Sequence, residues 1–327
     1  RGIETKVVPA RGYELELMKV LPLRGTGAAG IVRGALRAAG LVPEAFSLLQ
    51  RRRVRAVFSV GGYAAGPISL AARLRGLPLA LLEPNAVMGL ANWITAPMVD
   101  RAYLAFAEAE PAFPPARILR SGVPIRAGFT PQPYALGSGG LRILVLGGSQ
   151  GAKSLNEAVP VALGRLGSGF SVVHQCGPAH LAAATQAYTE AGLAAVATVI
   201  PFIEDMPAAL AAADLVIGRS GASAVSEICA VGRPSVLLPY PFAAGDHQRI
   251  NALALERAGA ASCIEASVAT PQAIAEVVGP LLRERGRLTT MASSAQRLGR
   301  PEAARTIAAD LLALAGISVD SSYREAS

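Results

Sequence analysis

The stretch over residues 213–239 constrains the fold more than any other part of the chain. An apolar run at 215–217 stops at Ser220-Gly221, a helical pattern follows, Gly232-Arg233-Pro234 ends it, and a second apolar run begins. This order predicts a strand–helix–strand unit of a parallel sheet. Unpaired amides at the helix start would attract anions, and the Glu227 carboxylate suits sugar hydroxyls. The stretch therefore favours a nucleotide site, although on spacing alone a capped helix with a solvated Glu227 is the commoner explanation.

Strands alternate with helices along the rest of the chain. Predicted strands at 56–60 and 141–146 each enter a glycine turn, at Gly61-Gly62 and Gly147-Gly148, and a predicted strand at 79–82 ends at Glu83. This alternation predicts an α/β protein with two doubly wound parallel sheets, whose ligands bind at the carboxyl ends of the strands. Pro- and Gly-rich residues at 125–140 predict a linker between domains at 1–124 and 141–315, with a flexible tail at 316–327.

Charge is unevenly distributed over the 327 residues. Residues 1–140 contain 17 Lys and Arg against 8 Asp and Glu, whereas residues 141–327 contain 14 against 15. A basic first half indicates an anionic membrane surface or a phosphorylated substrate, and the lack of aromatics within its basic runs argues against nucleic acid. No apolar run reaches the ~18 residues that span a bilayer, because charges such as Arg73 and Arg75 interrupt each candidate. The three cysteines have no metal or redox spacing and indicate buried apolar residues in a reducing compartment.

Eight segments, in order, resemble the MurG family of glycosyltransferases, which add N-acetylglucosamine to the lipid-linked muramyl pentapeptide of bacterial cell walls. They are R-G-I-E-T-K-V-V-P near the start, G-G-Y-A-A-G-P at 61–67, E-P-N-A-V-M-G-L-A-N at 83–92, G-V-P-I-R at 122–126, G-G-S-Q-G-A at 147–152, F-I-E-D-M at 202–206, R-S-G-A-S-A-V-S-E at 219–227 and H-Q-R-I-N-A at 247–252. The resemblance implies a GT-B fold of two Rossmann-like domains facing a cleft.

The resemblance also implies that the second domain holds most of the donor, UDP-N-acetylglucosamine. Ile203 would pair its backbone with uracil, Glu227 would take the ribose hydroxyls, and Gln248 would bind the sugar. The implied donor-binding residues are Asn85, Arg126, Ser149, Ile203, Ala222, Ser223, Ala224, Val225, Ser226, Glu227, His247 and Gln248. No cofactor and no metal are expected, because the chain has no D-x-D pair and helix dipoles can stabilise the departing UDP.

The first glycine turn is implied to serve the acceptor, an undecaprenyl-diphosphate-linked muramyl pentapeptide. Its residues are Gly61, Gly62, Tyr63 and Gly66, for which a tight turn without a ligand is the competing interpretation. A peripheral protein at the cytoplasmic face of the cell membrane would need a surface for anionic lipid. That surface, or an ordinary amphipathic helix in water, would comprise Arg33, Arg37, Arg51, Arg52 and Arg53 with Leu36, Leu41, Phe46 and Leu49.

The family opens with a further glycine turn, G-G-T-G-G-H, which contains the histidine favoured as general base. Residue 1 falls after that turn, so we expect about 30 residues to be missing, a strand–helix unit and a strand, and transfer to be poor. Glu83 is then the best acid/base candidate for inverting transfer to the muramyl C4 hydroxyl, against a buried structural carboxylate. His174 is expected to be structural, His180 solvated and His247 a donor contact.

The sequence departs from the family at three positions. Val123 stands where Asn is frequent, Pro84 where Gln is frequent, and Ala224 where Thr is common, which removes a hydroxyl contact. Two other functions stay open: a UDP-N-acetylglucosamine epimerase, which would share the donor site, and a nucleotide-sugar binding module without turnover.

Overall fold

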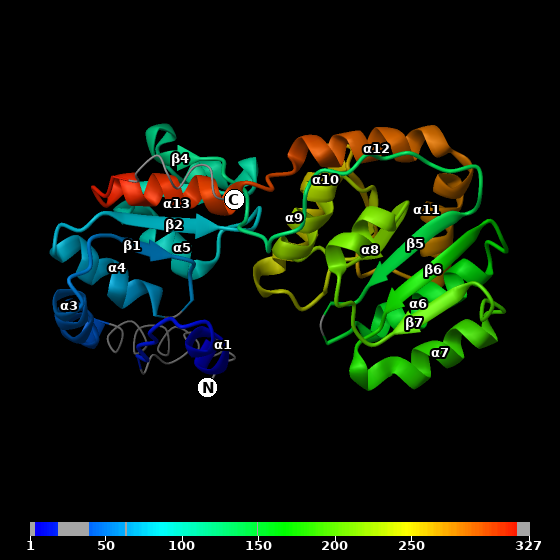
Figure 1. Ribbon diagram of the computed structural model, residues 1–327, viewed down its shortest axis with the longest axis horizontal. Coiled ribbons are helices and arrows are strands. Elements are labelled where there is room, and N and C mark those ends of the chain that lie inside the picture. Colours follow the sequence, from blue (N-terminus) through cyan, green and yellow to red (C-terminus); the bar gives the residue numbers. More distant parts are fainter. Residues whose placement is uncertain (1–3, 19–38, 63, 149, 319–327) are drawn as a thin grey trace. The chain divides into compact units, whose positions relative to one another are not determined.

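The computed structural model describes residues 4–18, 39–62, 64–148 and 150–318 (Figure 1). The chain divides into two compact units, one of residues 1–81 with 90–100 and one of residues 82–89 with 101–327. Tyr63, Ser149 and the basic residues Arg33 and Arg37 with Leu36 lie outside the described part of the chain. No helix among the described residues is both long and apolar enough to cross a bilayer.

The first unit is built of short helices around strand β1. Its elements are α1 (Glu4–Ala10), α3 (Val42–Arg51), β1 (Val57–Ser59), α4 (Ala65–Leu74), α5 (Leu90–Thr95) and the 3₁₀ turn η1 (Ala96–Met98). β1 pairs in parallel with β2 (Leu79–Glu83), from Val57 opposite Leu79 to Ser59 opposite Leu81. Every residue of β2 is buried, as expected of a parallel strand with both faces covered.

The second unit contains most of the chain. Its elements are β3 (Arg101–Leu104), η2 (Ala107–Ala112), η3 (Pro115–Arg117), β4 (Ile118–Leu119), β5 (Leu141–Leu146), α6 (Lys153–Gly164), β6 (Phe170–Gln175), η4 (Pro178–His180), α7 (Leu181–Glu190), β7 (Ala197–Ile200), α8 (Met206–Ala212), β8 (Leu215–Gly218), α9 (Ala222–Val231), β9 (Ser235–Leu237), η5 (Ala244–Asp246), α10 (His247–Arg257), β10 (Ala261–Cys263), α11 (Pro271–Arg283), α12 (Arg285–Leu298) and α13 (Ala303–Leu314).

Two sheets are formed, with strand orders β1-β2-β3-β4 and β10-β9-β8-β5-β6-β7. All five pairings of the six-stranded sheet are parallel, which confirms the predicted α/β class. The chain begins this sheet at β5, builds outward to β7 and then returns to the other side of β5 with β8. Strand order therefore reverses between β5 and β8, and in open α/β sheets ligands bind beyond the strand ends at such a point.

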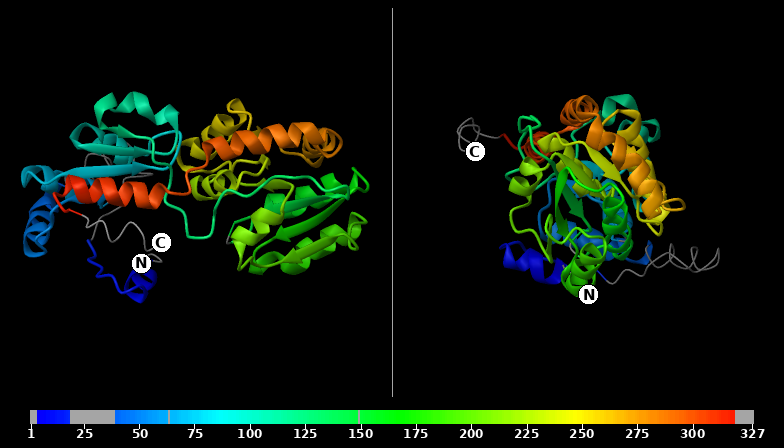
Figure 2. Two further views of the ribbon diagram at one scale, coloured as in Figure 1. Left: turned by 45° about the horizontal axis from the view of Figure 1, so that its top comes forward. Right: turned by 90° about the vertical axis from the view of Figure 1, so that its right-hand side faces the viewer.

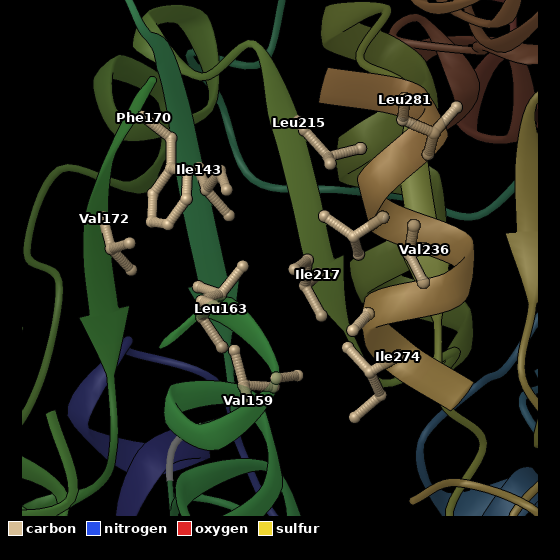
Figure 3. Packing of buried hydrophobic residues seen from close by; sticks show 14 of the residues in the cluster. Ile143, Val159, Leu163, Phe170, Val172, Leu215, Ile217, Val236, Ile274 and Leu281 are labelled. Atoms are coloured by element: carbon tan, nitrogen blue, oxygen red, sulfur yellow. The ribbon is translucent and has the colours of Figure 1, made fainter. Parts of the chain in front are cut away.

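Helices cover both faces of the six-stranded sheet (Figure 2). On one face, Ile143 of β5 and Ile217 of β8 pack with Val159 and Leu163 of α6 and Ile274 of α11, as Figure 3 shows. On the other face, alternate residues of the same strands pack against α8 and α9. Strand side chains alternate between the two faces of a sheet, so a strand that is buried on both faces has consecutive apolar residues, as β5 has at 143–146.

Helix α9 begins and ends where the sequence predicts. Gly221 is its N-cap, and Gly232 ends it in the left-handed conformation, with φ 79°. The backbone N–H of Gly232 donates to the carbonyls of Ile228 and Cys229, which closes the last turn. The amino end of α9 thus lies directly after β8, beside the reversal in strand order.

Only some residues of the expected membrane surface are exposed to solvent at α3. Leu49 is 5% exposed and packs inside the unit, because it lies on the inner face of an amphipathic helix, so its assignment to a membrane-facing surface was wrong. Arg52 pairs with Glu14 at 2.5 Å and with Glu16 at 2.6 Å, so its charge is compensated. Arg51 and Arg53 are exposed and have no ion pair within the described residues.

Candidate functional site

The turn over residues 147–151 is locked between β5 and the end of β6. Gly151 has φ 77°, and a Cβ added there would lie 1.9 Å from the carbonyl oxygen of Cys176. The Gln175 side chain donates to the carbonyl of Gly148 at 3.2 Å, and the Gly147 N–H donates to the Gln175 carbonyl at 3.2 Å. Only glycine permits this approach, which delivers the chain into α6 without a side-chain cap. The amides at the start of α6 are therefore available to an anion.

The start of α9 is open in the same way. Its N-cap, Gly221, has no side chain, and no side chain caps its first turn. The neighbouring Ser220 is buried and donates its hydroxyl to the carbonyl of Gln248 at 2.7 Å, so it serves α10 and not the α9 amides. Two uncapped helix starts, those of α6 and α9, thus follow the adjacent strands β5 and β8.

A cavity of about 1020 Å³ lies at these strand ends. Of the predicted donor-binding residues, it brings together Arg126, Ile203, Ser223, Ala224, Glu227 and Gln248. It also contains residues to which the sequence analysis gave no role, namely Lys153, Arg219, Phe202, Tyr240 and Phe242. The sequence signal for Arg219 was its position directly after the β8 strand, where ligand-binding side chains gather.

Two predicted donor residues lie on the other side of α9. Val225 and Ser226, with Cys229, line a second cavity of about 350 Å³. At about 100° per residue, positions 223, 224 and 227 share one face of a helix, whereas 225, 226 and 229 lie on the opposite one. Ala222 and His247 line neither cavity, and the His247 Nδ1 atom lies 2.7 Å from the Ala244 carbonyl oxygen.

Glu227, on α9, is the more buried of the two glutamates that line the larger cavity. Its side chain is 15% exposed, and its Oε1 accepts a hydrogen bond from Arg126 at 3.3 Å. Burial raises the pKa of Glu227, and the nearby Arg126 guanidinium opposes that shift. A carboxylate held in this way is ready to accept hydrogen bonds from ligand hydroxyls once Arg126 shares or releases it.

Arg219 supplies positive charge to the same cavity. Its guanidinium donates to the carbonyls of Leu238 and Pro239 and to the Ser154 hydroxyl, the last at 2.6 Å in the first turn of α6. Burial lowers the pKa of Arg219, and within the described part of the chain no carboxylate pairs with it. Its charge therefore adds to the field of the two helix starts, which favours an anion in the cavity.

The predicted acid/base residue, Glu83, anchors the loop that follows it. It ends β2, is 1% exposed, and accepts hydrogen bonds from the Asn85 N–H at 3.1 Å and the Gly89 N–H at 3.2 Å. The buried Asn251 of α10 then ties this loop to the start of α9. Its Nδ2 donates to Asn85 Oδ1 and to the Ser220 carbonyl, both at 3.1 Å.

The first glycine turn belongs to the other unit. The Gly61 N–H donates to the Ser59 hydroxyl at 3.2 Å, and a Cβ on Gly61, where φ is 86°, would lie 3.3 Å from Asn92 Oδ1. A Cβ on Gly62, which follows β1, or on Gly66, in the first turn of α4, would meet no atom of the described residues within 4 Å. Among the described residues, no group of three or more His, Cys, Asp or Glu side chains is placed to hold a metal ion.

His174 is structural, as predicted, and belongs to a buried hydrogen-bond network beside the 147–151 turn. Its Nδ1 lies 3.0 Å from the Tyr188 hydroxyl and its Nε2 lies 3.0 Å from Asn156 Oδ1. Asn156 in turn donates to the Cys176 carbonyl, against which Gly151 packs. Burial lowers the pKa of His174 from 6.5 to about 4, because the interior disfavours the charged ring.

This shift predicts a pH dependence of stability. In the range between the folded and unfolded pKa values the unfolded chain binds the proton more tightly, so the stabilisation from neutral His174 is complete above about pH 6.5 and decreases as the pH falls toward about 4. Between about pH 7.5 and about pH 5, the free energy of unfolding of His174→Gln should fall by about 2 kcal/mol less than that of the parent. Urea unfolding at both pH values measures this. His180→Gln is the control and should follow the parent; equal losses in the His174 variant would contradict the prediction.

Comparison with known proteins shows the family to which the chain belongs. Residues 1–104 match the model of the glycosyltransferase family 28 N-terminal domain, and residues 142–307 match that of its C-terminal domain. A UDP-N-acetylglucosamine–N-acetylmuramyl-(pentapeptide) pyrophosphoryl-undecaprenol N-acetylglucosamine transferase of Sorangium cellulosum is 52% identical over 318 residues, which are 96% of this chain and 78% of that protein.

Solved structures agree. The crystal structure of MurG from Acinetobacter baumannii matches with a TM-score of 0.84 at 31% identity, over 95% of this chain and 88% of that one, which confirms the GT-B fold. A UDP-GlcNAc 2-epimerase from Neisseria meningitidis matches with a TM-score of 0.60 at 13% identity, over 94% and 88% of the two chains, and this likeness extends to the fold alone. The chain belongs to glycosyltransferase family 28 and, within it, to the MurG family of glycosyltransferases.

Proposed function

We propose that this protein transfers N-acetylglucosamine from UDP-N-acetylglucosamine to the C4 hydroxyl of an undecaprenyl-diphosphate-linked muramyl pentapeptide. The single observation that carries the proposal is the cavity at the β5–β8 reversal, where two uncapped helix starts and Arg219 lie near Glu227. The 52% identical relative carries the name of such a transferase. The product would enter peptidoglycan synthesis, on which the cell wall, cell shape and cell division depend.

Each part of the donor has a suitable partner in the cavity. The diphosphate takes the amides at the starts of α6 and α9 together with Arg219, the ribose diol takes Glu227, and uracil takes the backbone at Ile203. Gln248, at the start of α10, takes the sugar. As the bond to the anomeric carbon breaks, negative charge grows on UDP, and the helix starts and Arg219 stabilise it.

The acceptor side of the proposal rests on different residues. The turn of Gly61, Gly62 and Gly66 would bind the acceptor diphosphate, with free space at Gly62 and Gly66 and with Gly61 held close to Asn92. Glu83 would act on the attacking hydroxyl only if it released the loop amides that it now binds, so its positioning of Asn85 is the role that the geometry supports best. No metal or cofactor has a part in the proposed reaction.

Release of UDP tests the proposal. The protein should release UDP from UDP-N-acetylglucosamine when the muramyl lipid acceptor is added, and the lipid product should gain one N-acetylglucosamine by mass. Release without acceptor, with conversion of the sugar to its epimer, would instead identify an epimerase. Tight UDP binding without either product would identify a binding module.

We further propose that the protein works as a peripheral protein on the cytoplasmic face of the membrane, with contributions from Arg51 and Arg53 at the end of α3. The excess of Lys and Arg in residues 1–140 supports this, because anionic lipid attracts each basic residue near it by about 1 kcal/mol. Co-sedimentation with phosphatidylserine-containing vesicles should exceed that with neutral vesicles. Arg51→Glu should lower the partition coefficient about tenfold, whereas Arg287→Glu on α12 should not. Equal binding to both vesicles would contradict the electrostatic attraction.

A further inference from the structure

Two exposed aromatic side chains stand at the edge of the larger cavity. Phe242 is 82% exposed and Tyr240 is 45% exposed, and both line the cavity. Their ring centroids lie 5.6 Å apart at an interplanar angle of 73°, an edge-to-face contact. A phenylalanine ring left in water lacks the stabilisation that its burial against apolar atoms would bring. An exposed aromatic pair in this position therefore indicates that an apolar part of a ligand packs against the two rings when the ligand enters the cavity.

Strand order fixes which end of the cavity the pair occupies. Phe202 and Ile203 follow β7, at one edge of the sheet, whereas Tyr240 and Phe242 follow β9, near the other edge. Between them lie β5 and β8, whose ends hold the two uncapped helix starts. With the diphosphate at those helix starts, the base and the sugar must lie on opposite sides of it. With uracil at Ile203, as in the proposed function, the sugar would lie toward Tyr240.

Hydrogen bonds connect the aromatic pair to the polar groups of the sugar end. The Tyr240 N–H donates to Gln248 Oε1 at 3.0 Å, which fixes that amide beside the ring. The Arg219 guanidinium lies 5.7 Å from the centre of the Tyr240 ring, and the same guanidinium reaches Ser154 at the start of α6. Tyr240 therefore contacts both Arg219 and Gln248, and its neighbour Phe242 is exposed to solvent.

We propose that Tyr240 and Phe242 form the apolar wall of the sugar subsite, against which the C–H face and the acetyl methyl group of the transferred hexosamine pack. This rests on the proposed function, because it requires a nucleotide sugar in the cavity. Gln248 satisfies the sugar hydroxyls on one side, and the aromatic wall covers the apolar atoms that hydrogen bonds cannot hold. The wall contributes to binding of the sugar and contributes nothing to binding of UDP.

Calorimetric titration of UDP and UDP-N-acetylglucosamine tests this assignment. For Phe242→Ala we expect affinity for UDP-N-acetylglucosamine to fall about tenfold, as for the loss of one large buried aromatic contact, with affinity for UDP unchanged. Phe242→Trp, which keeps an aromatic surface, should retain the parent's affinity for both. Because Phe242 is so exposed, neither variant should disturb folding, and unchanged UDP binding verifies this in the same experiment.

Three results would overturn the inference. One is a Phe242→Ala variant with the parent's affinity for UDP-N-acetylglucosamine. Another is an equal loss of affinity for UDP, which would place the ring beside the nucleotide. The last is a parent protein that binds neither ligand, a result that would also contradict the proposed function. The first two results would contradict only the aromatic wall.

Discussion

Glu227→Gln should bind UDP at least about tenfold more weakly than the parent protein, since a hydrogen bond to a charged group contributes about 1.5–3 kcal/mol. The carboxylate accepts hydrogen bonds through both oxygens, and so can hold both ribose hydroxyls at once. Glutamine keeps one acceptor oxygen and presents an NH₂ donor in place of the other, so one hydroxyl loses its acceptor. The substitution also removes the charge that pairs with Arg126 at 3.3 Å. Isothermal titration calorimetry with UDP measures the effect.

Glu157→Gln is the matched control, because it changes a glutamate that lines the same cavity. Glu157 lies on α6, is 66% exposed, and pairs with Lys153 only at 3.8 Å. This exposed ion pair therefore contributes little to stability. Removal of the negative charge of Glu157 should not weaken the binding of a diphosphate. An unchanged UDP affinity in Glu227→Gln, or a similar loss in both variants, would contradict the ribose role of Glu227.

Gly151→Ala should lower the free energy of unfolding by more than about 3 kcal/mol, because two costs add at this position. A residue with a Cβ is strained at φ 77°, and that Cβ would lie 1.9 Å from the Cys176 carbonyl oxygen, well inside van der Waals contact. The atoms nearest to this Cβ belong to the Cys176 backbone, so rotation of a side chain cannot relieve the clash. The 147–151 turn would have to separate from β6, and UDP affinity should fall with it. Chemical unfolding and UDP titration measure the two effects.

Gly148→Ala separates the clash from the backbone strain. Gly148 has φ 78°, nearly that of Gly151, but a Cβ there would meet no atom within 4 Å. Its expected loss of stability is therefore only about 1 kcal/mol, the cost of the left-handed conformation. Equal losses in the two variants would show that the approach of the turn to Cys176 is not what requires glycine at 151.

Local sequence was sufficient to predict the elements around the site. The strand predicted at 141–146 matches β5, and the apolar run at 215–217 matches β8 but for its last residue, Gly218. Gly232 ends α9 because a left-handed residue closes the last helical turn, a rule that depends on neighbours in sequence. Such signals are local, so they survive without knowledge of the fold. The composite order of eight short segments then identified the family, which similarity over 96% of the chain confirmed.

What the sequence could not predict depends on which faces meet. The partners of His174 come from α6 and α7, which pack against β6, and its burial follows from that packing. Leu49 looked like a surface residue beside a basic run and is buried. The helical period already separates Ser223 from Ser226, but which of the two faces lines the larger cavity depends on how α9 packs on the sheet.

The sequence by itself therefore determined the strand–helix–strand unit at 213–239, the glycine turns and the family, since each depends on residues close together in the chain. Only the tertiary structure decided which side chains share a cavity. The reversal between β5 and β8 brings residues from 126 to 248 to one sheet edge, and it leaves Phe242 and Tyr240 open to solvent there. Strand pairing joins residues far apart in sequence, and no local pattern records which strand will be the neighbour.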